Sequence, residues 1–124
     1  MSSSETSAEQ RTIMIVEDDW LIADDLAHTV KDIGYRALGP AHSVSAALDI
    51  LGKGEVDAAL LDVNLRGETS YPVADAMAEQ GIPFAFLSGY TTDQLKPGFQ
   101  DRPLLSKPLN PGALRDRLSL MLRE

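Results

Sequence analysis

The chain has 124 residues, an apolar fraction of 44% and a formal net charge of −8 at pH 7. This length fits one globular domain with a real core, and the acidic balance argues against electrostatic binding to nucleic acid or to an anionic membrane surface. The absence of cysteine excludes disulfides, thiolate catalysis and cysteine-ligated zinc.

The N-terminal segment has the composition of a flexible tail. Residues 1–11 are polar and rich in serine, and residues 12–124 are predicted to form one domain. The sequence has no apolar run as long as a membrane span and no signal-peptide core, so we expect a cytoplasmic protein. Because the last predicted helix reaches the end of the chain, we expect no attached output domain.

Short apolar runs predict five β-strands. A run of this kind is typical of a strand that is buried on both faces of a parallel sheet. The second strand has the weakest signal. The predicted strands span residues 12–16, 35–39, 57–61, 83–87 and 103–105.

Capping residues and apolar spacing predict helices between these strands. Asp18 or Asp19 can cap a first helix, and Ser43 can cap the second. Asn110-Pro111 is a favourable start for the last helix, with a cap followed by proline in the first turn.

The second half of the chain has weaker helix signals. A loop through Gly67 leads to a short helix from about Pro72 to Gln80. Residues 91–100 have poor helical periodicity, so we expect at most a turn or two of helix there. Strands that alternate with helices in this way predict a parallel sheet covered on both faces, with right-handed crossovers.

Four of the predicted strands run into polar residues of different kinds. The first runs into Glu17-Asp18, the third into Asp62 and the fourth into Ser88, and the fifth leads through Ser106 into Lys107. In an open parallel sheet the carboxyl ends of the strands form the edge where ligands bind. Three acids, a hydroxyl and an amine at one edge suit a divalent cation and a phosphoryl group.

The acids fit the chemistry of a magnesium site. Mg²⁺ takes oxygen ligands, usually one or two carboxylates together with waters and phosphate oxygens. Asp18 and Asp62 can supply the carboxylates, Glu17 can act through a water, and the carbonyl of Asn64 can complete the set. Asp62 can also attack phosphorus to form an aspartyl-phosphate. Taken alone, each acid is equally compatible with a solvated loop residue or a helix cap.

Ser88 and Lys107 complete the set of candidates. Ser88 can donate a hydrogen bond to a phosphoryl oxygen, although a lone serine before glycine is more often a turn residue. Lys107 can neutralise such an oxygen as a point charge, although a lone lysine is more often a solvated surface charge. A cis Lys107-Pro108 bond would re-aim this lysine, and the sequence leaves the isomer open. The combined order and placement of these residues is much more specific than any one of them.

Together these residues resemble the receiver domain of two-component response regulators over nearly the whole chain. The resemblance implies a flavodoxin-like, doubly wound five-stranded sheet of order 2-1-3-4-5. It also implies that Asp62 accepts phosphate from a sensor histidine kinase, that Glu17, Asp18, Asp62 and Asn64 hold Mg²⁺, and that Ser88 and Lys107 bind the phosphoryl group. We expect no enzyme activity beyond self-phosphorylation and self-dephosphorylation. The expected output is a switched surface for a downstream protein or a phosphotransfer protein.

The chain departs from the family pattern at the residues that change position when a receiver is phosphorylated. Receivers usually carry an aromatic residue three places before the lysine, where this chain has Leu104. The fourth helix is predicted to be reduced or mobile. The segment from Pro83 to Tyr90 resembles an atypical subfamily with a Pro-Phe-x-Phe-Ala-Thr-Gly motif, often single-domain proteins partnered by kinases of the HWE type. By the same resemblance, Asn64 and Tyr90 tune the lifetime of the phosphoryl group.

Two other interpretations stay open. One is a phosphatase of the haloacid dehalogenase type, although that family needs a second aspartate where this chain has Asn64. The other is a pseudo-receiver that binds a partner without switching, or a phosphate sink. The intact acid set argues against a pseudo-receiver, but the departure at Leu104 keeps it open.

Overall fold

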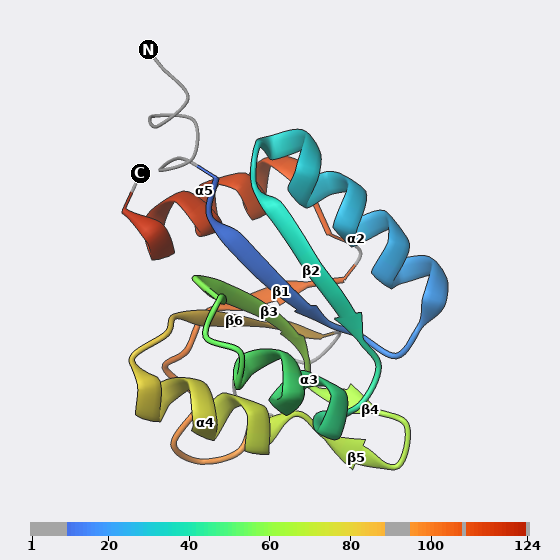
Figure 1. Ribbon diagram of the computed structural model, residues 1–124, viewed down its shortest axis with the longest axis vertical. Helices are drawn as coiled ribbons and strands as arrows, with labels where there is room; N and C mark the ends of the chain where they lie inside the picture. The colour runs from blue at the N-terminus through green and yellow to red at the C-terminus, as the bar shows by residue number, and fades with distance from the viewer. Residues whose placement is uncertain (1–9, 89–94, 108, 124) are drawn as a thin grey trace.

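The computed structural model describes residues 10–88, 95–107 and 109–123, and these form a parallel sheet with helices on both faces (Figure 1). The strand order is β2-β1-β3-β6-β7. Counted along the chain, this is order 2-1-3-4-5, which confirms the predicted flavodoxin-like α/β fold. The strands are β1 (Thr12–Val16), β2 (Arg36–Ala41), β3 (Ala58–Asp62), β6 (Phe84–Ser88) and β7 (Leu104–Ser106).

In the described part of the chain, helices cover both faces of the sheet (Figure 1), and their buried side chains place two of them on each face. They are α2 (Trp20–Ile33), α3 (Val44–Leu51), α4 (Tyr71–Gln80) and α5 (Pro111–Leu122). Leu26 of α2 and Leu114 of α5 share one buried cluster, whereas Leu51 of α3 and Met77 of α4 lie in the other. Within the described residues, none of these helices has the length and apolar content needed to cross a bilayer.

The three central strands are buried along their whole length, as expected for strands covered on both faces. Side chains alternate along β1, so Met14 and Val16 pack toward α3 and α4 whereas Ile13 and Ile15 pack toward α2 and α5. Each fully buried aliphatic side chain contributes about 1.5–3 kcal/mol to folding. The core therefore fixes where the strands end, and with them the polar residues that follow.

The predicted helix caps form, and the structure decides between Asp18 and Asp19 as the cap of α2. Asp19, rather than Asp18, caps α2, because its Oδ1 accepts hydrogen bonds from the N–H groups of Leu21 and Ile22 at 3.0 and 3.1 Å. Ser43 caps α3 and Asn110 caps α5 in the same manner. Asp18 is consequently available for other contacts.

The predicted loop through Gly67 is in part regular structure. Residues Asn64–Leu65 (β4) and Glu68–Thr69 (β5) pair as a short antiparallel hairpin beside the sheet (Figure 1). Gly67 adopts φ +77° between the two strands, a conformation that favours glycine.

The segment between β6 and β7 is described only in part. Its described residues 95–103 form turns rather than helix, in line with the predicted reduction of the fourth helix. Residues 89–94 and Pro108 lie outside the described residues, and so do the predictions for Tyr90 and for the Lys107-Pro108 bond. Most of the predicted N-terminal tail, residues 1–9, also lies outside them.

Candidate functional site

Three acids come together where the neighbouring strands β1 and β3 end. Glu17 directly follows β1, Asp18 comes next, and Asp62 is the last residue of β3. One carboxylate oxygen of each residue lies within 4.8 Å of the others. Glu17 and Asp62 are buried, whereas Asp18 is partly exposed. The parallel pairing of the strands thus assembles acids that are far apart in the sequence.

Lys107 places its ammonium group among these carboxylates. It follows β7, and its Nζ lies 2.9 Å from Glu17 Oε1 and 3.3 Å from Asp62 Oδ2. Because these acids are buried, the contacts are screened less by water than surface ion pairs are. The ammonium contacts two of the three acids, so its single positive charge does not balance the group. This donor set fits a divalent cation with oxygen ligands.

Burial raises the pKa of Glu17 from its usual 4.5 to about 7, and the proximity of Asp62 acts in the same direction. Hydrogen bonds from Lys107 and from the Asp19 N–H, which lies 3.1 Å from Glu17 Oε2, oppose this rise. Burial lowers the pKa of Lys107, but its hydrogen bond to Glu17 and the attraction of Asp62 outweigh burial and raise that pKa. Lys107 is therefore a constant positive charge in the site.

Asp18 is held by the β4–β5 hairpin. The backbone N–H of Arg66 donates a hydrogen bond to Asp18 Oδ2 at 3.1 Å, and Arg66 Nε lies 3.4 Å from the same oxygen. The sequence analysis did not identify Arg66, because no local pattern connects it with an acid 48 positions away. Only the folding of the hairpin over the strand ends brings the two together.

Of the other predicted site residues, Ser88 ends its strand at the same edge of the sheet, whereas Leu104 begins β7 and lies away from that edge. Ser88 is the buried last residue of β6 and pairs with Ser106 of β7. Its carbonyl accepts a hydrogen bond from the Lys107 N–H at 3.1 Å, which ties the ends of the two strands together. Asn64, the first residue of β4, is exposed. Leu104 pairs with Phe86 and packs, half-buried, against the core next to α3 and α4.

An aromatic cluster lies behind this edge, on the face covered by α4. The ring of Tyr71 stacks on Phe99 at 5.3 Å between centroids and meets the edge of Phe86 at 5.9 Å. The hydroxyl of Tyr71 accepts a hydrogen bond from the Lys96 N–H at 2.9 Å. The Pro-Phe-x-Phe sequence signals part of this cluster, but the contribution of Tyr71 and Phe99 is visible only in the structure. The cluster connects α4 with the described chain after β6.

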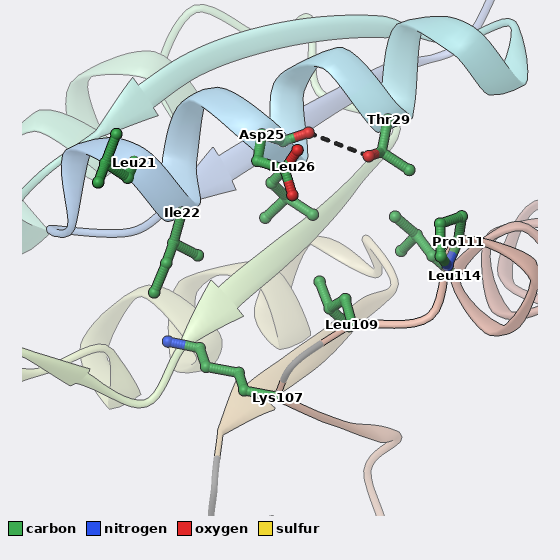
Figure 2. A pocket seen from close by; sticks show the side chains of 9 residues that line it. All are labelled: Leu21, Ile22, Asp25, Leu26, Thr29, Lys107, Leu109, Pro111 and Leu114. Carbon is green, nitrogen blue, oxygen red and sulfur yellow. Dashed lines mark hydrogen bonds between the residues drawn. The ribbon is translucent and has the colours of Figure 1, made fainter.

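A groove of about 570 Å³ lies between α2 and the chain that leads into α5. Figure 2 shows Leu21, Ile22 and Leu26 on α2 opposite Leu109, with Lys107 at one end. The lining is mainly apolar, and Leu21 is 83% exposed. An apolar surface therefore extends directly from the charged site.

The sequence was compared with protein families and with curated proteins. A family model described as the response regulator receiver domain matches residues 13–119. The chain is similar to the transcriptional regulatory protein YvrH of Bacillus subtilis, with 29% identity over 119 residues that cover 93% of this chain and 50% of that protein. PdtaR of Mycobacterium tuberculosis is 24% identical over 89% of this chain and 54% of its own length. The chain thus spans about half the length of these relatives.

Solved structures show the same similarity. The solution structure of SdrG from Sphingomonas melonis Fr1 is 39% identical with a TM-score of 0.80, and the match covers 98% of this chain and 99% of that one. The BeF3-activated conformation of SdrG from Pseudomonas melonis Fr1 is 41% identical with a TM-score of 0.77, over 90% and 95% of the two chains.

Proposed function

Because the chain belongs to the response regulator receiver domain family, we propose that it accepts a phosphoryl group on Asp62 and switches a partner-binding surface. Receiver domains are signalling domains rather than classical enzymes, and they take phosphate from histidine kinases. The observation that carries the proposal is the placement of Asp62, with Lys107 Nζ 3.3 Å from its Oδ2 and two further acids beside it.

The reaction moves the phosphoryl group from a histidine of the donor to Asp62. An Asp62 carboxylate oxygen attacks phosphorus, a P–O bond forms, and the P–N bond to the histidine breaks. The leaving imidazole keeps the electron pair and takes a proton from solvent. Lys107 offsets the charge that collects on the phosphoryl oxygens, as a fixed cation placed where charge develops. Ser88, at the end of the adjacent strand, supplies a hydroxyl to the same edge.

Glu17, Asp18, Asp62 and the carbonyl of Asn64 would hold Mg²⁺. The cation supplies charge neutralisation for the incoming phosphoryl group. The fit rests on three carboxylate oxygens within 4.8 Å of one another and on the negative charge that Lys107 leaves uncompensated.

The groove beside Lys107 is suited to the protein that delivers the phosphoryl group. A donor histidine must come within bonding distance of Asp62, so its supporting helix has to rest on the adjacent surface. Exposed Leu21 and Ile22 offer that surface apolar contacts. A kinase of the HWE type is the donor class to test first.

We expect Leu21→Glu to slow phosphoryl transfer from the cognate kinase at least about tenfold. The substitution removes an apolar contact and places a charge where the docked kinase would bury it, and both effects weaken docking. Transfer from acetyl phosphate, which needs no protein surface, should stay within about twofold of wild type. The measurement is the initial rate of Asp62 phosphorylation from each donor. Leu120→Glu, at an exposed position of α5, is the matched control. Equal slowing with both donors would contradict docking at this groove.

Phosphorylation is expected to change the surface formed by described residues 95–107. The ends of β6 and β7 are joined through Ser88 and Lys107, and the Tyr71 hydroxyl binds the Lys96 N–H. If Ser88 and Lys107 move toward a phosphoryl group, the conformation of residues 95–107 therefore changes with them, although Leu104 replaces the usual aromatic residue.

Amide hydrogen exchange with and without beryllofluoride measures that response. Protection of the amides in residues 95–107 is expected to rise several-fold in the presence of beryllofluoride, because the phosphoryl mimic holds both strand ends. Asp62→Asn should show no such change. Identical protection in both states of the wild type would support a pseudo-receiver instead.

A further inference from the structure

Arg66 contacts Asp18, which is one of the proposed magnesium ligands. Its backbone N–H and its Nε both contact Asp18 Oδ2, at 3.1 and 3.4 Å. The side chain of Arg66 is 86% exposed and that of Asp18 is 18% exposed. The guanidinium group therefore reaches the rim of the acid cluster from the solvent side.

The hairpin that carries Arg66 is fixed on both sides. Arg66 attaches it to Asp18, in the loop between β1 and α2. On the other side, Glu68 Oε2 accepts a hydrogen bond from the Val44 N–H at the start of α3, at 3.0 Å. The contact to Val44 does not involve the cation site. The hairpin can therefore stay in place when the Arg66 side chain leaves Asp18.

We propose that Arg66 is a competing counter-ion for Asp18 that sets the Mg²⁺ affinity of the site. This inference rests on the proposed function. A cation that binds Asp18 must displace the guanidinium group from Oδ2 or bind against its charge, and both costs weaken binding. Arg66 thereby raises the Mg²⁺ concentration at which half of the sites are filled.

A purely structural role for Arg66 predicts the opposite sign. If the side chain served to hold the hairpin and orient Asp18, its removal would leave a looser ligand and weaker Mg²⁺ binding. Arg66→Ala keeps the backbone N–H bond to Asp18 and removes only the guanidinium group. The direction of the change in affinity therefore separates the two roles.

The test is a Mg²⁺ titration followed by calorimetry and by the fluorescence of Trp20. This tryptophan lies two residues after Asp18, and its ring stacks on His42 with 5.3 Å between the ring centroids. Arg66→Ala is expected to bind Mg²⁺ about three- to tenfold more tightly than wild type at low salt, with the gain shrinking at about 0.5 M KCl. Arg66→Lys should stay within about twofold of wild type. Lys53, an exposed lysine in the turn that follows α3, gives the control variant Lys53→Ala for the loss of one positive charge.

A double-mutant cycle assigns the gain to the Asp18 contact. In the Asp18→Asn background, Arg66→Ala should no longer improve binding, because the shared partner is gone. Equal or weaker Mg²⁺ binding by Arg66→Ala overturns this inference and leaves the proposed function in place. Wild-type protein that binds no Mg²⁺, or binding that Asp18→Asn leaves unchanged, overturns the metal site itself and this inference with it.

Discussion

Asp62→Asn is expected to abolish phosphorylation while the domain stays folded. The amide has nearly the same shape as the carboxylate, but it does not act as a nucleophile toward phosphorus, so label transferred from a kinase or from acetyl phosphate should fall to background. The exchange also removes one of three clustered negative charges. We therefore expect the metal-free variant to be at least as stable as wild type, because less like-charge repulsion remains around Glu17.

The measurement is phosphate incorporation on a phosphate-affinity gel, together with thermal unfolding of the same preparation. Asp101→Asn, at an exposed turn, is the matched control and should be labelled like wild type. Persistent labelling of Asp62→Asn would show that another residue accepts the phosphoryl group.

Gly39→Ala is expected to cost about 2–4 kcal/mol of unfolding free energy, a large part of the stability of a small domain. Gly39 adopts φ +102° within β2, a conformation that L side chains rarely take. A Cβ atom there would lie 2.8 Å from the Ala41 nitrogen and 3.0 Å from the Ile15 carbonyl oxygen. Both neighbours are backbone atoms of paired strands, so neither can move without disturbing the sheet.

Urea unfolding measures this cost, and Gly34→Ala is its matched control. Gly34 also has a positive φ, +119°, but a Cβ atom there would meet nothing within 4 Å. That variant should lose only about 1 kcal/mol, from backbone strain at the helix end. Equal losses in the two variants would show that the contacts around Gly39 relax.

Gly39→Ala should also weaken Mg²⁺ binding at the proposed site. The Ala41 carbonyl accepts the Glu17 N–H at 3.0 Å, so a shift of Ala41 displaces the backbone of a proposed magnesium ligand. Mg²⁺ affinity is therefore expected to fall in Gly39→Ala and to stay near wild type in Gly34→Ala.

The acid and lysine positions were predictable because strand ends are local features of a sequence. Short apolar runs mark the strands, and the first polar residue after each run lies at the carboxyl edge of a parallel sheet. Asp62 and Ser88 follow from this rule, and Lys107 comes directly after Ser106, the first polar residue of its run. The strands β3, β6 and β7 each begin and end one residue later than predicted. The same rule does not decide which acid caps a helix, and Asp19 rather than Asp18 has that role.

The sequence by itself determined the strands, most of the helices and the acids, hydroxyl and amine at one edge. Periodicity, capping and apolar runs act over a few residues, and the sheet order followed from the resemblance to a known family. The tertiary structure alone decided the hairpin at β4–β5, the contact of Arg66 with Asp18 and the stacking of Tyr71 on Phe99. These contacts join residues that are far apart in the sequence. A local pattern of residues does not show which distant segments will pack against each other.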